Sequence, residues 1–352
     1  MGWLSRVFGG DARAPRDADA VLRAALLAVL DRDLDEAEEL LITLVERNSD
    51  SVEPYLALAR IYRMRGEVGR SIRIHQNLLL RLDPSSKQGR DALLGLAADF
   101  QRGGFLRRAI ASYEELLTHD PKHLEGHHAL VRLLVDARNF DRAIEVTRAL
   151  AHLEGGKGRA AEAELRARMA EVAQAEGRSD DAFRAVKKAL RRDKKCVSAW
   201  IVLAGLEAER GRTKAALAAW SKVPSLDPGR AASIYPQLEA SWAAVDQPRG
   251  FESALRKVLE DHPDDAAARI VLARHLEARG EIDEAVSELR RCLARRPHDL
   301  AARTALGRLL LVAQGDGAAL KEYAELLDVL ERSEGANVGS RHDAISAQQG
   351  HG

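Results

Sequence analysis

The chain has 352 residues, of which 46% are hydrophobic, 31% are charged and only 4% are aromatic. Lysine plus arginine and aspartate plus glutamate both number 54, so the formal net charge is zero. This composition supports a packed core and excludes a disordered chain, while the neutral charge argues against a general nucleic-acid binder. The two cysteines, Cys196 and Cys292, cannot form a disulfide framework, so we expect a reducing, cytoplasmic location.

The segment 1–16 precedes any repeat. Four of its apolar side chains would share one face of a short helix: Trp3, Leu4, Val7 and Phe8. One interpretation is an amphipathic foot that contacts a partner or the inner membrane peripherally. The other is a frayed terminus or a cap over the first repeat, and the sequence leaves both open.

Residues 17–332 repeat a pattern of about 34 residues. A marker position in the second helix of each predicted pair holds Ala37, Ser71, Ala109, Ala143, Ala182, Ala216, Phe251, Ala285 and Ala319. A second marker lies twelve residues earlier, in the first helix, at Ala25, Ala59, Ala97, Val131, Ala170, Ala204, Glu239, Ala273 and Gly307. Small residues at most of these positions allow the two helices of a pair to approach closely.

Glycines and prolines punctuate the repeats. Turn glycines fall between the two markers at Gly66, Gly104, Gly177, Gly211 and Gly280. Prolines that should stop the second helix follow at Pro121, Pro228, Pro263 and Pro297. The period, glycines and prolines together resemble the tetratricopeptide repeat family. The resemblance implies an all-α solenoid, a right-handed superhelix of about nine helix–turn–helix repeats whose concave groove binds peptides or proteins.

Three regions depart from the regular pattern. The repeat at 232–263 has Glu239 and Phe251 where small residues are expected, so we predict altered packing there. The link Gly155–Gly158 is the most plausible hinge, and the polar, glycine-containing segment 333–352 is predicted to be a disordered tail.

The first helices of the N-terminal repeats would present a basic strip to the groove. The predicted partner-binding residues are Arg60, Arg63, Arg102, His128 and Arg132. Such a strip suits an acidic peptide or a carboxylate. The alternative is a solvated face on which these cations pair with Glu53, Asp91 and Glu125.

Motifs for chemistry are missing from the sequence. It contains no phosphate-binding loop, nucleophile elbow or zinc-protease motif, so we predict no enzyme activity and no cofactor. His119, His123 and His127 are four residues apart, but Pro121 should break the helix between the first two, so we predict no metal site.

The stretch 66–76, GEVGRSIRIHQ, resembles the second repeat of the lipopolysaccharide assembly protein B family. Residues 182–198, with Lys187-Lys188 and Asp193-Lys194, resemble a later repeat of that family. Members typically also have an N-terminal membrane helix and a C-terminal rubredoxin-like metal-binding domain, and this sequence has neither pattern. At His75 the repeat has a histidine in place of an apolar residue, and we predict that a neighbouring helix satisfies its ring.

The resemblance implies a non-enzymatic adaptor that regulates lipopolysaccharide synthesis by recruiting a partner protein. In the family, the partners are an inner-membrane protease and a lipid A biosynthesis enzyme. The alternative is a general tetratricopeptide scaffold or co-chaperone for the assembly of another bacterial complex.

Overall fold

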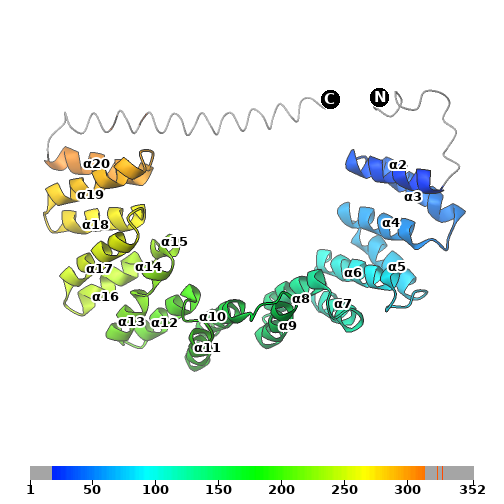
Figure 1. Ribbon diagram of the computed structural model, residues 1–352, viewed down its shortest axis with the longest axis horizontal. Coiled ribbons are helices and arrows are strands. Elements are labelled where there is room, and N and C mark those ends of the chain that lie inside the picture. Colours follow the sequence, from blue (N-terminus) through cyan, green and yellow to red (C-terminus); the bar gives the residue numbers. More distant parts are fainter. Residues whose placement is uncertain (1–17, 314–322, 324–326, 328–352) are drawn as a thin grey trace. The chain divides into compact units, whose positions relative to one another are not determined.

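The computed structural model describes residues 18–313 together with positions 323 and 327. Over these residues the regular elements are all α-helices (Figure 1). The all-α repeat class predicted from the sequence is therefore confirmed. The segments 1–16 and 333–352 lie outside the described residues, so the amphipathic foot and the tail remain predictions.

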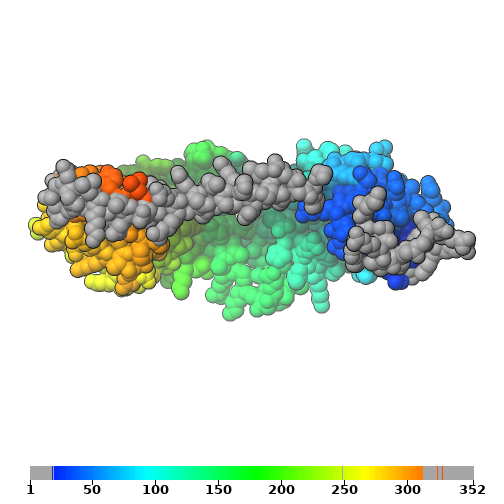
Figure 2. Space-filling model, turned by 90° about the horizontal axis from the view of Figure 1, so that it is seen from above, coloured from blue at the N-terminus to red at the C-terminus, as the bar shows by residue number. Residues whose placement is uncertain are grey.

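The helices fall into two compact units, the first extending to Leu165 and the second beginning at Arg166. Helix α10 (Arg159–Ala175) crosses this boundary. Many consecutive helices of each unit pack closely against one another, and Figure 2 shows the surface that they form. The N-terminal unit contains α2 (Ala18–Leu30), α3 (Leu34–Arg47), α4 (Val52–Met64), α5 (Val68–Leu79), α6 (Lys87–Arg102), α7 (Leu106–His119), α8 (Leu124–Asp136) and α9 (Phe140–Leu153).

The C-terminal unit continues the antiparallel pairs but interrupts them once, with two four-residue helices. It contains α11 (Ser179–Arg192), α12 (Val197–Glu209), α13 (Thr213–Trp220), α14 (Val223–Leu226), α15 (Pro228–Ala231), α16 (Tyr235–Ala244), α17 (Pro248–Asp261), α18 (Ala266–Ala278), α19 (Ile282–Arg295) and α20 (Leu300–Ala313).

The small marker residues lie where the two helices of a pair cross. Ala59 in α4 and Ser71 in α5 are both fully buried. The hydroxyl of Ser71 donates a hydrogen bond of 2.7 Å to the backbone carbonyl of Ala59. A longer side chain at either position would separate the helices, which is the physical reason for the repeated alanines.

Each predicted turn glycine adopts the left-handed conformation that joins two helices tightly. The φ angles of Gly66, Gly104, Gly177, Gly211 and Gly280 lie between 70° and 81°. Three other turns use a non-glycine residue in the same region, namely Arg32, Arg138 and Asp246. Side chains other than glycine rarely occupy this region, so the sequence pattern could not identify those three turns.

A recurring hydrogen bond closes the link before a first helix. The backbone carbonyls of Pro121, Pro263 and Pro297 accept hydrogen bonds from the side chains of His127, Arg269 and Arg303, respectively. In each case the donor lies six residues after the acceptor. Trp200 does the same for Lys194. Four links of different composition thus share one way of satisfying a backbone carbonyl.

The predicted irregular repeat does change its packing. The preceding second helix, α13, has only eight residues. Pro228 begins the short helix α15, whereas the sequence pattern predicted that it would simply stop a helix. At the marker positions, Phe251 is buried and packs edge-to-face on His275, with ring centroids 5.3 Å apart, and Glu239 accepts a 2.9 Å bond from Arg274. Large side chains therefore occupy the marker positions that small residues hold in most other repeats.

Candidate partner-binding groove

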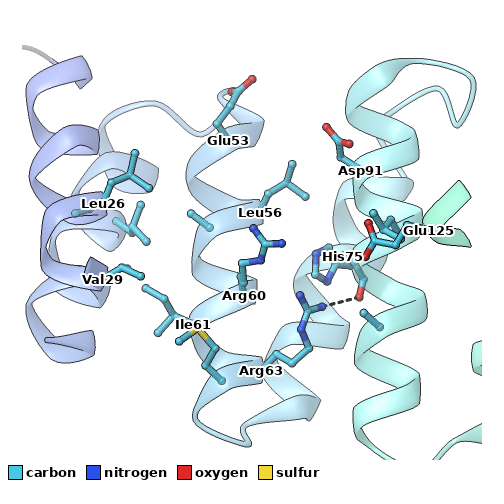
Figure 3. Close-up of a pocket in the computed structure, with 17 residues that line it drawn as sticks. Leu26, Val29, Glu53, Leu56, Arg60, Ile61, Arg63, His75, Asp91 and Glu125 are labelled. Carbon is cyan, nitrogen blue, oxygen red and sulfur yellow. Dashed lines mark hydrogen bonds between the residues drawn. The ribbon is translucent and has the colours of Figure 1, made fainter. Parts of the chain in front are cut away.

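The first helices of the N-terminal unit line a groove of about 570 Å³. Helices α2, α4 and α6 contribute most of its walls, and α8 contributes Glu125 (Figure 3). The groove floor is the set of apolar side chains Leu26, Val29, Leu56, Met64 and Leu94. Leu26 and Met64 remain 52% and 54% exposed, so the floor offers apolar surface that the described part of the fold does not cover.

A largely buried polar cluster connects α4, α5 and α6 beside the groove. Asp99 of α6 is fully buried and accepts a 2.8 Å bond from Arg63 of α4, while its other oxygen lies 2.6 Å from Nδ1 of His75 in α5. Arg63 also donates to the backbone carbonyl of Gly95 (3.0 Å; Figure 3). The histidine ring is thus satisfied by a neighbouring helix, as predicted, and the cluster joins two successive repeats.

Gly95 is required by this cluster. A methyl group at Gly95 would come within 2.2 Å of Nε2 of His75. Since real side chains essentially never approach that closely, the glycine creates the space that the ring occupies. The histidine and the glycine therefore form one packing unit, although they lie in different repeats.

The charges in the groove are mixed. Arg60 is exposed and its guanidinium extends between α4 and α6, where it makes no ion pair with any residue in the described ranges (Figure 3). Glu53, Asp91 and Glu125 line the same groove. Hydrogen bonds from its own backbone N–H and from Gln88 lower the pKa of Glu53, so this carboxylate stays charged under mildly acidic conditions.

The structure distributes the five predicted site residues over three places. Arg60 and Arg63 line the groove, but the charge of Arg63 is neutralised by Asp99. Arg102 is exposed at the end of α6, outside the groove lining. His128 and Arg132 line a separate depression of about 640 Å³, where His128 lies 3.2 Å from Glu154. The five residues therefore do not form one continuous strip, and their contact with a partner stays a prediction.

Sequence reasoning missed the apolar floor and the acidic members of the groove as binding elements. Leu26, Leu56 and Leu94 belong to helices that also supply core residues, so their spacing does not separate groove from core. The alternative interpretation of the sequence paired Glu53, Asp91 and Glu125 with the cations of the strip, but none of the three forms an ion pair with Arg60 or Arg63. The sequence did contain a signal for these three carboxylates, because each of them lies six residues before the marker position of its first helix.

Two histidines at the start of α8 serve local structure. Nδ1 of His123 accepts a bond from the backbone N–H of Gly126 at the start of α8. His127 is buried, and its Nε2 donates a hydrogen bond of 2.9 Å to the carbonyl of Pro121. Across the residues that the structure describes, no group of three or more His, Cys, Asp or Glu side chains is placed to hold a metal ion. Within those same residues, no helix combines the length and apolar character needed to cross a membrane.

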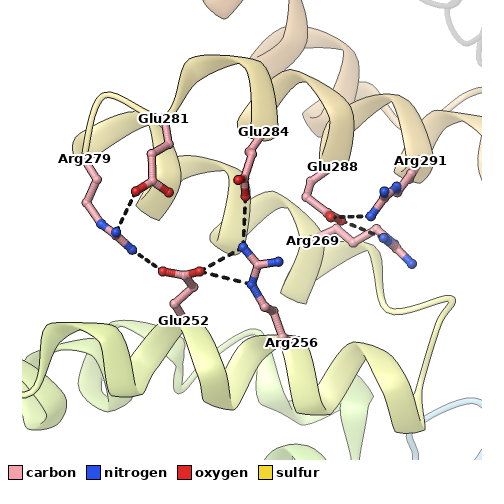
Figure 4. Close-up of polar contacts among 8 residues, drawn as sticks. All are labelled: Glu252, Arg256, Arg269, Arg279, Glu281, Glu284, Glu288 and Arg291. Carbon is pink, nitrogen blue, oxygen red and sulfur yellow. Dashed lines mark hydrogen bonds and ion pairs between the residues drawn. The ribbon is translucent and has the colours of Figure 1, made fainter.

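Charged side chains of the C-terminal unit are arranged differently. We define the paired network as Glu252 and Arg256 of α17, Arg279 after α18, and Glu281 and Glu284 at the start of α19 (Figure 4). Arg256 bonds Glu252 at 2.8 Å and Glu284 at 3.0 Å, and Arg279 bonds Glu252 and Glu281. Each charge in this network has an opposite charge within reach.

Family models described as tetratricopeptide repeat match residues 22–87, 94–153 and 167–231, and a further one matches residues 252–309. The unmatched stretch 232–251 falls in the repeat predicted to fit the pattern worst. A solved structure titled "Crystal structure of MamA protein" is similar, with 21% identity and a TM-score of 0.36; the match covers 49% of this chain and 93% of that one.

Two curated relatives carry the name lipopolysaccharide assembly protein B. The protein from Escherichia coli (strain K12) is 24% identical over 251 residues, which are 71% of this chain and 64% of the relative. The protein from Haemophilus influenzae is 26% identical over 275 residues, covering 70% of this chain and 68% of the relative. The chain thus spans less than two thirds of the Escherichia coli protein. The helix pairs, the markers and the matched family models establish that the chain belongs to the tetratricopeptide repeat family.

Proposed function

We propose that this protein is a non-enzymatic adaptor that holds a segment of a partner protein in the groove of its N-terminal unit. The observation that carries the proposal is the groove floor, where Leu26 and Met64 stay half exposed between successive first helices. Covering such side chains on binding contributes roughly 25 cal/mol for each Å² removed from water. The buried cluster beneath supports the proposal, because it holds α4, α5 and α6 in one arrangement before any partner arrives.

We further propose that the partner belongs to the control of lipopolysaccharide assembly at the cytoplasmic side of the inner membrane. Support comes from the similarity to the two proteins of that name over about 70% of this chain. The 66–76 stretch contributes His75 to the groove lining, so the region that suggested the family also borders the candidate site.

The test is affinity purification from the native bacterium with three forms of the full chain. A floor variant, Leu26→Gln/Met64→Gln, removes apolar surface from the groove, while Leu30→Gln/Leu80→Gln changes two exposed leucines that do not line it. We expect envelope-synthesis or membrane-proteolysis proteins with the wild type and the control, and their loss with the floor variant.

Two outcomes would count against the proposal in different ways. Retention of every partner by the floor variant would move the binding site away from the groove. Recovery of only partners from an unrelated complex would contradict the lipopolysaccharide role and favour the general scaffold.

A further inference from the structure

The sign of the charge along the groove identifies the chemistry of the segment that it accepts. This inference rests on the proposed binding function and concerns the same groove. Glu53, Asp91 and Glu125 belong to three successive first helices and lie six residues before positions 59, 97 and 131, respectively. We call these three carboxylates the acidic row. Their equivalence places one carboxylate at the same position of α4, α6 and α8.

The acidic row has no internal neutralisation. Glu53 accepts hydrogen bonds from Gln88 and Ser51, and within the described residues none of the three carboxylates forms an ion pair with a cationic side chain. The groove lining contains two guanidinium groups, but Asp99 neutralises that of Arg63, which leaves only Arg60 against three carboxylates. The groove therefore carries an excess of negative charge.

The register of the acidic row does not hold a carboxylate in every repeat. The equivalent positions in α12, α18 and α20 of the C-terminal unit hold Ser198, Ala267 and Ala301, which are uncharged, whereas α10 holds Glu164, which lines the neighbouring depression. A carboxylate at this position is therefore not a general requirement of the repeat.

The row and the floor face the same space. Figure 3 shows the carboxylates of Glu53 and Asp91 at one end of the groove, with Leu26 and Leu56 extending into it from α2 and α4. We propose that the groove accepts an amphipathic protein segment whose apolar side chains cover the floor and whose lysine or arginine side chains lie along the acidic row. This replaces the acidic peptide expected from the sequence. Arg60 would then face a single acidic residue or a carbonyl of the segment.

The experiment selects peptides from a random 16-residue library displayed on phage, using the full chain as the immobilised target. Selection is repeated against the floor variant Leu26→Gln/Met64→Gln, and only sequences that require the floor are kept. We expect these sequences to combine apolar residues with more lysine and arginine than aspartate and glutamate.

Individual selected peptides are then measured against two charge variants. Glu53→Gln/Asp91→Asn/Glu125→Gln removes the acidic row, and Glu39→Gln/Glu46→Gln/Glu115→Gln removes the same charge from exposed positions of second helices. Because each exposed ion pair contributes modestly, we expect the first variant to weaken binding about tenfold and the control less than about twofold. The loss should shrink as the salt concentration rises.

Three other results would contradict the proposal. Floor-dependent peptides that are acidic or uncharged would overturn the charge assignment and leave the proposed groove function standing. Equal weakening by both charge variants would also overturn it, since the effect would then follow net charge alone. A selection that yields no floor-dependent sequence would overturn both the inference and the proposed function.

Discussion

In the N-terminal unit, the carboxylates of the acidic row and the guanidinium of Arg60 line a groove and form no ion pair in the described part of the chain. In the C-terminal unit, the paired network joins α17 to α19, and the buried pair Arg269–Glu288 joins α18 to α19 at 2.8 Å. The acidic row and Arg60 thus lack ion pairs, whereas residues of the same types are paired in the network of the C-terminal unit.

The comparison shows how one repeat supports two uses of charge. Second helices of adjacent repeats lie close enough for their long side chains to pair, so charges there connect repeats. On the first helices of the N-terminal unit, the acidic row forms no ion pair in the described ranges and stays available to a ligand, whereas first helices of the C-terminal unit do pair, as Arg274 does with Glu239. Asp99 lies on the same helix as Asp91 but is buried, and it has two partners. Four predictions test this division.

The largest effect is expected from Asp99→Ala. In a mostly buried site, the substitution leaves His75 without its acceptor and leaves Arg63 with only the carbonyl of Gly95, so it should lower the free energy of unfolding by about 3 kcal/mol. Hydrogen exchange should accelerate in α4, α5 and α6 and stay unchanged in the C-terminal unit. Asp91→Ala on the same helix is the control and should change stability by less than about 0.5 kcal/mol. Equal effects of the two substitutions would contradict the assigned role of the cluster.

The next effect concerns Gly95→Ala. The added methyl group must displace the His75 ring, which should cost about 1–3 kcal/mol. Gly69→Ala in α5 is the matched control, because its methyl group would meet no atom within 4 Å and alanine is the better helix former. Chemical denaturation of both variants measures the difference. If Gly95→Ala were as stable as Gly69→Ala, the close approach between Gly95 and His75 would be refuted.

A smaller effect is expected in the paired network from Glu252→Gln. Burial raises the pKa of Glu252, but Arg256 and Arg279 lower it more, so the folded-state pKa lies below the ordinary 4.5. The stabilisation is present above that ordinary value and is lost as the pH falls through the lower folded-state pKa. We expect the variant to be less stable by about 0.5–1 kcal/mol at pH 7. Melting temperatures measured from pH 7 to pH 3 should converge, and a constant difference would show that the charge of Glu252 is not responsible.

The smallest effect on stability is expected from Arg60→Ala. Since this side chain is exposed and has no ion pair in the described ranges, the free energy of unfolding should change by less than about 0.5 kcal/mol. Binding of the selected peptides should nevertheless change, which a titration would detect. A loss of more than about 1 kcal/mol would mean that Arg60 supports the fold, as the charges of the C-terminal unit do.

Much of the fold was accessible from the sequence because its determinants are local. The repeated small residues, such as Ala59 and Ser71, mark helix crossings, and the glycines such as Gly66 mark left-handed turns. These features depend on neighbours within one repeat, so a period of about 34 residues exposes them. The poor repeat at 232–263 was recognisable for the same reason, through the large residues at its marker positions.

The candidate site depended on contacts that no local pattern contains. The sequence predicted Arg63 as a free groove cation, but Asp99, 36 residues away, neutralises it, and Gly95 makes room for His75. The helices, their pairing and their family were determined by the sequence itself, since spacing decides which faces pack. Which charges are neutralised and which remain for a partner was decided only by the tertiary structure, because it depends on side chains from successive repeats meeting in one groove.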